Sequence, residues 1–210
     1  MARVNHLTGL PRLANRFSVM RHGQSKANER GIIVSRFEND RRGDYGLTGL
    51  GRAQAVAAAS GSGLTGQTVI CSSDFARARQ TAQLVRERLG APPVIVAEAL
   101  RERCFGDWEG SPAANYERVW AADEAGTGGA DGGAEPAAAV LERASALVAD
   151  LERRYRGRDI LLVSHGDTLQ ILQAGFLGMD PSAHRRLPHL ATAEIRPVRL
   201  GNGPGGARSS

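Results

Sequence analysis

The chain has 210 residues, 41% of them hydrophobic and 23% charged, which is enough for one sizeable core or two small ones and excludes a largely disordered protein. No apolar run approaches the roughly eighteen residues of a transmembrane helix. The first twenty residues are interrupted by polar and charged side chains, so they lack the apolar stretch of a secretory signal. Two cysteines, Cys71 and Cys104, exclude a disulfide framework, and we expect a reduced, cytoplasmic protein.

The net charge of +5 raises the question of a nucleic-acid partner. Lys26 is the one lysine among 27 basic residues, and the arginines are interspersed with acids, as in Arg101-Glu102-Arg103. A dispersed pattern is typical of a solvated surface, so we expect neither a nucleic-acid nor a membrane partner. Arginine matches the geometry of phosphate and carboxylate groups, which favours a small anionic substrate. The sequence does not fix the oligomeric state, and a homodimer stays open.

Strands and helices are predicted to alternate along the chain after an N-terminal extension, residues 1–15, that shows no periodic pattern. Short apolar runs predict strands, whereas apolar residues at a 3.6-residue period and capping residues predict helices. The predicted elements are a strand at 17–20, a helix from 48 to about 59, a strand at 68–71, a helix at 73–89, a strand at 94–96, a short helix at 112–120, a long helix at 136–155, a strand at 160–163, a helix at 168–177 and an edge strand at 194–198.

This alternation predicts an α/β fold: a three-layer sandwich with a mainly parallel central sheet and helices on both faces. We assign residues 16–200 to a single domain with a small lid-like insertion at about 107–135. The insertion contains a stretch rich in Gly, Ala and Asp at 126–133, which is typical of a flexible loop. Residues 201–210 are expected to form a flexible tail.

Three predicted strands end in turns with reactive side chains. The turns are Arg21-His22-Gly23, Ser72-Ser73-Asp74 leading to Arg77, and Ser164-His165-Gly166. Because ligands of parallel α/β sheets bind beyond the carboxyl ends of the strands, we expect His22 and His165 to face one crevice. A lone histidine is more often an ordinary core or surface residue, but a glycine after each of these two permits close approach and favours a shared site.

Phosphoryl chemistry suits this set of side chains. A phosphoryl group in transfer needs fixed cationic donors, which Arg21 at a strand end and Arg77 in the first turn of a helix would supply. A neutral imidazole is a competent nucleophile, and nearby guanidinium groups depress its pKa. The other histidines lie in peripheral stretches and no cysteine pair has zinc spacing, so we expect no metal and no cofactor.

A leaving alkoxide also needs a proton donor, for which Glu102, Asp107 and Glu109 are equal candidates on composition alone. The region holds a rival nucleophile, because five residues separate Cys71 from Arg77, the spacing of cysteine-based tyrosine phosphatases. That pattern requires a histidine before the cysteine and a glycine within the loop, and both are missing here. A small buried residue at a strand end is the ordinary role of such a cysteine.

Five segments together resemble the histidine phosphatase superfamily, also called the phosphoglycerate mutase-like family. An Arg-His-Gly triplet alone is weakly specific, but five segments in family order, covering residues 17 to about 175, are highly specific. The segments are Arg21-His22-Gly23-Gln24-Ser25 with Asn28, Leu47-Thr48-x-x-Gly51-x-x-Gln54-Ala55, residues 72–82, residues 102–110 and Ser164-His165-Gly166.

The resemblance implies a mechanism in which His22 takes up the phosphoryl group as a phosphohistidine. It implies that Glu102 protonates the leaving oxygen and then helps to activate water, roles that one carboxyl can play in turn. Arg21, Arg77 and His165 would hold the phosphoryl oxygens. The substrate-binding residues that it implies are Arg21, Gly23, Gln24, Asn28, Arg77, His165 and Gly166. Thr48, Gly51 and Gln54 of the second segment are expected to serve helix capping and packing rather than catalysis.

Departures from the pattern of the family's mutases favour its phosphatase branch. The mutases place Trp where this chain has Ala27 and Tyr where it has Phe105. The 63 positions from Glu102 to His165 are also fewer than we expect for mutases. A shorter cover admits water, so hydrolysis is predicted.

We therefore expect a phosphomonoesterase for a small acidic phosphorylated metabolite, such as a sugar phosphate, a phosphoglycerate derivative or a nucleotide-loop precursor. Mutase-type phosphoryl transfer and a non-catalytic scaffold that binds phosphate ligands are the alternatives. The substrate specificity is expected to come from the cover at 111–135 and from arginines such as Arg42, Arg103 and Arg118.

Overall fold

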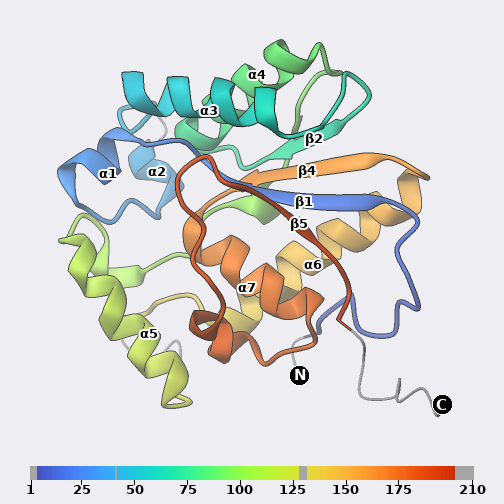
Figure 1. Cartoon of the computed structure of the whole chain (residues 1–210). Helices are drawn as coiled ribbons and strands as arrows, with labels where there is room; N and C mark the ends of the chain where they lie inside the picture. The colour runs from blue at the N-terminus through green and yellow to red at the C-terminus, as the bar shows by residue number, and fades with distance from the viewer. Residues whose placement is uncertain (1–3, 41, 128–131, 202–210) are drawn as a thin grey trace.

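The computed structural model describes residues 4–40, 42–127 and 132–201, and its centre is a five-stranded sheet (Figure 1). The strands lie in the order β3-β2-β4-β1-β5. Their bounds are Arg16–Arg21 for β1, Val69–Ser72 for β2, Ile95–Val96 for β3, Asp159–Ser164 for β4 and Ile195–Val198 for β5. All pairings are parallel except that of β5, which runs antiparallel to β1 at the edge, where Pro197 is tolerated.

Helices cover both faces of this sheet, which confirms the predicted three-layer α/β fold. Helices α3 and α4 lie on one face, and α6 and α7 lie on the other (Figure 1). The helices are α1 Lys26–Arg30, α2 Phe37–Asp40, α3 Gly49–Gly61, α4 Ala76–Leu89, α5 Tyr116–Glu124, α6 Ala137–Arg154 and α7 Gly166–Phe176, with 3-10 turns η1 Glu98–Leu100, η2 Gly106–Trp108, η3 Ala113–Asn115 and η4 Pro181–Arg186. None of the helices in the described part of the chain is long and apolar enough to cross a bilayer.

The central strand β4 shows why its sequence is a continuous apolar run. Ile160 and Leu162 pack toward α6 and α7, in the same cluster as Val148, whereas Leu161 and Val163 pack toward α3 and α4. All four strand side chains are fully buried. A strand buried on both faces needs apolar residues at every position, and it stabilises both layers at once.

The observed boundaries differ from the predicted ones mainly at helix starts. Helix α7 begins at Gly166, two residues early, because His165 is extended (φ −121°, ψ 166°) and serves as its N-cap. Helix α4 begins late, after Phe75. The short helices α1 and α2 were not predicted, since they are too short to show a period.

The N-terminal extension packs against the rest of the domain, although its sequence shows no periodic pattern. Leu7 is buried in the main core, and the Ala14 and Asn15 amides donate to the Glu152 carboxylate of α6. The predicted flexible tail, apart from Gly201, and residues 128–131 of the predicted glycine-rich loop lie outside the described residues.

Candidate active site

The carboxyl ends of β1 and β4 bring the two predicted histidines together. His22 directly follows β1 and His165 directly follows β4, and their ring centroids lie 5.2 Å apart. Arg77, the second residue of α4, lies between them: its Nε is 3.1 Å from His22 Nε2 and 3.1 Å from His165 Nδ1. Residues separated by up to 143 positions therefore form one cluster at the sheet edge.

The hydrogen bonds of this cluster fix which nitrogen of each imidazole carries its proton. Arginine only donates, so His22 Nε2 and His165 Nδ1 must accept from Arg77. The protons then lie on His22 Nδ1, which donates to the Gly23 carbonyl at 2.7 Å, and on His165 Nε2, which donates to Ser73 Oγ at 2.9 Å. The ring lone pair of His22 is thus on Nε2, inside the cluster, where it accepts from Arg77.

Burial keeps both imidazoles neutral. Desolvation, followed by the positive charge of Arg77, lowers the pKa of His22 and of His165 well below the ordinary value of 6.5. Arg21 adds to the lowering at both rings. At neutral pH, His22 Nε2 is consequently unprotonated and nucleophilic.

Two guanidinium nitrogens in this cluster are buried without a hydrogen-bond partner among the described residues: Arg21 Nε and Arg77 Nη1. Other donors of the same groups are satisfied, since Arg77 Nη2 donates to the Val34 carbonyl at 2.8 Å and Arg21 Nη1 to the Leu190 carbonyl at 2.9 Å. Leaving a buried donor unpaired costs about 1–3 kcal/mol, and more for a charged group. An anion bound between these arginines would satisfy both donors.

The carboxyl of Glu102 lies beside this cluster in a low-dielectric environment. Its Oε1 accepts from the Arg103 amide at 2.9 Å, the Thr168 amide at 3.2 Å and Thr168 Oγ1 at 3.1 Å. Burial, followed by the nearby charge of Asp167, raises the pKa of Glu102, and Arg77 opposes this shift. A carboxyl with a raised pKa can hold a proton and donate it.

The other two candidate acids have different surroundings. The Glu109 carboxylate accepts from the amide and hydroxyl of Ser35, the amide of Arg36 and the side chain of Asn39, so it ties η2 to the segment before α2. Asp107 is exposed. Of the three acids, Glu102 is therefore the one that is buried, with a raised pKa that the charge of Arg77 opposes.

Cys71 lies away from this chemistry. Its side chain is fully buried in the main core, and desolvation raises the pKa of the thiol to about 12. A thiol with this pKa forms almost no thiolate at neutral pH, and a fully buried side chain meets no substrate, so both observations argue against the rival cysteine mechanism.

The other four residues predicted to contact substrate differ in their burial and hydrogen bonding. Gly23 is buried, and its amide donates to Thr81 Oγ1 at 3.0 Å, whereas Gly166 opens α7, where helix N–H groups favour anions. Both the backbone and the side chain of Gln24 are held. Its backbone N–H donates to Gln54 Oε1, and its side-chain Oε1 accepts from Thr48 Oγ1. Asn28 is exposed, and its Oδ1 completes a capping box at the start of α1. Its contact with substrate stays a prediction.

Thr48 and Gly51, which we expected to cap and pack a helix, have these roles at the start of α3. Thr48 is its N-cap and accepts from the Gly51 amide at 3.0 Å. An ideal Cβ at Gly51 would lie 2.0 Å from the Gln24 carbonyl oxygen, so this position requires glycine for close approach to the loop after His22.

Of the three arginines expected to set specificity, Arg103 was assigned wrongly. It is fully buried, pairs with both oxygens of Asp123, and also contacts Asp167 at 3.3 Å. Its Nε donates to the Glu135 carbonyl, which leaves no nitrogen for a substrate. Arg42 and Arg118 are exposed, and their role in specificity stays a prediction.

Sequence reasoning missed three polar residues near the cluster: Tyr116, Asp167 and His189. Tyr116 of α5 packs edge-on against Phe105 and stacks on Trp120, and burial with the charge of Glu102 raises its pKa. Asp167 accepts from Trp120 Nε1 at 2.8 Å and thereby ties the cover to α7. His189 contacts Arg21. The partners of the last two residues are distant in sequence, by 47 positions for Asp167 and Trp120 and by 168 for His189 and Arg21, so motif spacing does not reveal these contacts.

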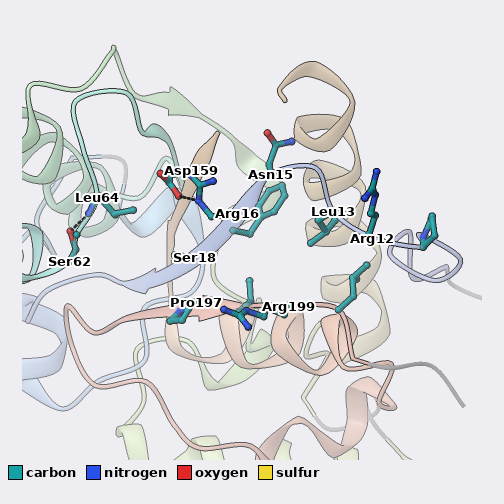
Figure 2. A pocket seen from close by; sticks show the side chains of 15 residues that line it. Arg12, Leu13, Asn15, Arg16, Ser18, Ser62, Leu64, Asp159, Pro197 and Arg199 are labelled. Carbon is teal, nitrogen blue, oxygen red and sulfur yellow. Dashed lines mark hydrogen bonds and ion pairs between the residues drawn. The ribbon is translucent and has the colours of Figure 1, made fainter. Parts of the chain in front are cut away.

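A separate cavity of about 610 Å³ lies at the opposite end of the sheet (Figure 2). It is lined by the start of β1, the start of β4 and the end of β5, with Arg12, Arg16 and Arg199 around it. Arg16 is paired with Asp159 at 2.7 Å. The four residue steps from Phe17 to Arg21 span roughly 13 Å in a strand, so this cavity is remote from the histidines. In the described residues, no group of three His, Cys, Asp or Glu side chains is arranged to hold a metal ion.

Comparison with known proteins assigns this arrangement to a family. Residues 17–207 match the model of the histidine phosphatase superfamily, branch 1. A glucosyl-3-phosphoglycerate phosphatase of Mycobacterium tuberculosis (strain H37Rv) is 35% identical over 179 residues, 78% of this chain and 76% of that protein. A 2,3-bisphosphoglycerate-dependent phosphoglycerate mutase of Methylobacterium sp. is 32% identical over 72% of this chain and 76% of that protein. Among solved structures, a mycobacterial glucosyl-3-phosphoglycerate phosphatase complexed with VO3 aligns with a TM-score of 0.71 and 29% identity, over 89% of this chain and 99% of that one.

The fold and the cluster of two histidines and two arginines are thus those of a phosphoryl-transfer protein, and the chain belongs to the histidine phosphatase superfamily. The resemblance expected from five sequence segments is confirmed. Phosphatase relatives at 33–35% identity over most of the chain support a phosphoric monoester hydrolase.

Proposed function

We propose that the chain is a phosphomonoesterase that works through a phosphohistidine on His22 with Glu102 as general acid and base. The observation that carries this proposal is the pair of buried, unpartnered nitrogens, Arg21 Nε and Arg77 Nη1, beside the neutral His22. Three oxygens of a phosphoryl group in transfer carry negative charge, and fixed cationic donors stabilise that charge without reorganisation.

In the first half-reaction, His22 Nε2 attacks phosphorus, the N–P bond forms, and the bond from phosphorus to the ester oxygen breaks. Glu102 supplies the proton that neutralises the leaving alkoxide, a role that its raised pKa favours. The His22 Nδ1–H bond to the Gly23 carbonyl holds the ring as positive charge develops on it. His165 would contact a phosphoryl oxygen by turning its Nε2–H from Ser73 Oγ to the anion, since its Nδ1 accepts from Arg77.

In the second half-reaction, water attacks the phosphorus of the phosphohistidine. Glu102, now ionised, takes the water proton as the N–P bond breaks, which returns both groups to their starting states. Arg77 stabilises the ionised form of Glu102 during this interval, since its charge lowers the pKa of that carboxyl. The Glu102 carboxyl thus donates a proton in the first half-reaction and accepts one in the second.

The substrate that we propose is a small phosphorylated acid, such as a phosphoglycerate that carries a sugar. The support comes from the glucosyl-3-phosphoglycerate phosphatases among the relatives and from the arginine-rich site. A metabolite panel that compares kcat/KM for glucosyl-3-phosphoglycerate, phosphoserine and simple sugar phosphates tests this substrate class.

The intermediate is tested by rapid quench with a ³²P-labelled ester. Wild-type protein is expected to trap label in an acid-labile, base-stable form on His22, and His22→Ala to trap none and to lose turnover. The matched control is Cys71→Ser, which changes a nucleophile outside the site and should keep both label and turnover. Label on Cys71, or normal turnover in His22→Ala, would disprove the histidine mechanism.

Phosphoglycerate mutase activity is the second candidate, because a mutase is among the relatives at 32% identity. Against it, Phe105, where we expected a mutase to have Tyr, is fully buried with Ile33 and Val119 and reaches no substrate. The two activities are separated by incubating 3-phosphoglycerate: a mutase makes 2-phosphoglycerate, whereas a phosphatase releases inorganic phosphate.

A further inference from the structure

His189 is an exposed histidine whose ring lies against a buried part of the candidate site. Its Nε2 is 2.6 Å from Arg21 Nη1, the same nitrogen that donates to the Leu190 carbonyl at 2.9 Å. Arginine has no acceptor, so His189 Nε2 must be unprotonated and must accept this bond. A protonated His189 would bring two cations into contact, and the bond would be lost.

The backbone around His189 is fixed by contacts that hold its ring in place. Arg196 of β5 donates to the Pro188 carbonyl at 2.8 Å and to the His189 carbonyl at 3.0 Å. The same loop is tied to the end of β1, where the Ala193 amide donates to the Arg21 carbonyl at 3.0 Å. The imidazole is therefore presented to Arg21 by a built loop rather than by a mobile surface segment.

Gly166 completes the arrangement from the side of α7. An ideal Cβ there would lie 3.4 Å from His189 Cε1 and 3.5 Å from Arg21 Nε, so the helix start packs against both side chains. Arg21 is thus fixed at Nη1 by two acceptors, while its Nε is left buried and unpartnered beside the start of α7. Fixing one end of a planar guanidinium fixes the direction of the other.

We propose that His189 is a positioning residue, which holds the Arg21 guanidinium in the orientation that turns its Nε–H toward the bound phosphoryl group. This inference rests on the proposed function, because it assigns Arg21 to phosphate binding. His189 itself contacts neither the phosphoryl group nor the reacting atoms. It acts through Arg21.

Charged groups from four elements surround His189 and determine when it can accept. Desolvation, then Arg21 from β1 and Arg185 from η4, lower its pKa from the ordinary 6.5, and Asp167 of α7 and Glu194 before β5 oppose this. The neutral, accepting form consequently prevails at neutral pH. Acidification protonates His189, repels Arg21 and weakens its hold on an anion.

Binding of inorganic phosphate, measured by calorimetry, tests the proposal without turnover. His189→Leu removes the acceptor and should weaken phosphate binding about tenfold at pH 7.5, the size expected when one charge-assisted bond to the anion is no longer held in place. His189→Gln retains an acceptor oxygen and should restore most of the affinity. His6→Leu, which replaces an exposed histidine outside the site, should bind as wild type. Thermal melting verifies that each variant is folded.

Two further measurements separate positioning from a general structural effect. In an Arg21→Ala background, His189→Leu should cause no additional loss, because the guanidinium through which it acts is gone. The ratio of wild-type to His189→Gln phosphate affinity should fall as pH is lowered from 7.5 to 5.5. Titration of phosphate, His22 and Glu102 is common to both proteins and cancels in that ratio.

Wild-type affinity in His189→Leu, or an equal loss with and without Arg21, overturns the inference while leaving the proposed function intact. A wild-type protein that hydrolyses no phosphate ester and binds no phosphate overturns both.

Discussion

Replacement of Glu102 by Gln is a sharp test of the candidate site because it preserves shape and removes a proton. The three donors on Oε1, from the Arg103 amide and from the amide and hydroxyl of Thr168, all find an oxygen on glutamine. The side chain therefore keeps its place, and what is lost is the ability to give and take a proton. General acid catalysis is worth about 10²–10⁴-fold.

The expected loss depends on the leaving group. An alkyl phosphate, whose alkoxide must be protonated, should lose about 10²–10⁴-fold in kcat with Glu102→Gln. Release of an activated phenol from p-nitrophenyl phosphate needs little protonation and should lose much less in that step. Steady-state kinetics with both esters, and a pre-steady-state burst that isolates the first half-reaction, measure the difference. An equal loss of the burst rate on both esters would refute the role of Glu102 as an acid.

Glu102→Gln is expected to lower activity but to raise the stability of the fold at neutral pH. The raised pKa of Glu102 means that, above its ordinary value of 4.5, the unfolded chain releases a proton that the folded chain retains. The folded state then binds more protons, so this carboxyl lowers the free energy of unfolding as pH rises. Glu102→Gln should therefore raise the melting temperature at pH 7 and leave it nearly unchanged at pH 4. A lower melting temperature at pH 7 would contradict this reasoning.

Three other outcomes follow from the packing and charges. Cys71→Ser puts a hydroxyl in the apolar core, so it should lower the free energy of unfolding by about 1–3 kcal/mol in urea while kcat/KM stays near wild type. Gly51→Ala should cost about 1–3 kcal/mol and reduce activity, because its Cβ meets the Gln24 carbonyl. The lowered pKa values of His22 and His165 make the unfolded state bind more protons below pH 6.5, so stability should fall on acidification by up to about 1.4 kcal/mol per pH unit for each ring.

Each of these outcomes has a control variant or a result that would contradict it. Gly49→Ala lies two positions from Gly51 in the same helix turn with no atom near its ideal Cβ, so it should be neutral or stabilising. Equal destabilisation by the two alanines would disprove the close-approach argument. For the pH effect, His165→Gln should flatten the acid side of the stability curve, and an unchanged slope would show that this ring is not held neutral. A large loss of turnover in a folded Cys71→Ser would reopen the thiol mechanism.

The sequence was sufficient to predict the fold and the two histidines of the candidate site because both depend on local pattern. The apolar run of β4 ends at His165, and the run of β1 ends at Arg21 and His22, so the parallel sheet alone brings these side chains to one edge. No contact between distant residues had to be guessed. The placement follows from the rule that ligands bind at the carboxyl ends of parallel strands.

The role of Arg103 and the choice between the candidate acids depended on contacts that sequence spacing does not reveal. Arg103 follows the charged pair Arg101-Glu102 and so was expected at the surface, and only the fold shows that its buried guanidinium pairs with Asp123 and Asp167. The choice of Glu102 over Glu109 has the same origin. Both lie in an irregular stretch without a period, where the backbone path decides which carboxyl meets the arginines and which one bonds Ser35.

Burial has opposite effects on the pKa of a base and of an acid, and the candidate site uses both effects at once. Desolvation lowers the pKa of His22 and raises that of Glu102, so both shifts favour the neutral form of the group. Those are the forms that a nucleophile and a proton donor need before substrate binds. Arg21 and Arg77 cannot respond in this way, because a guanidinium stays charged when buried. These two arginines therefore place fixed positive charges beside His22, and a phosphate dianion is a ligand that balances them while leaving His22 and Glu102 ready to react.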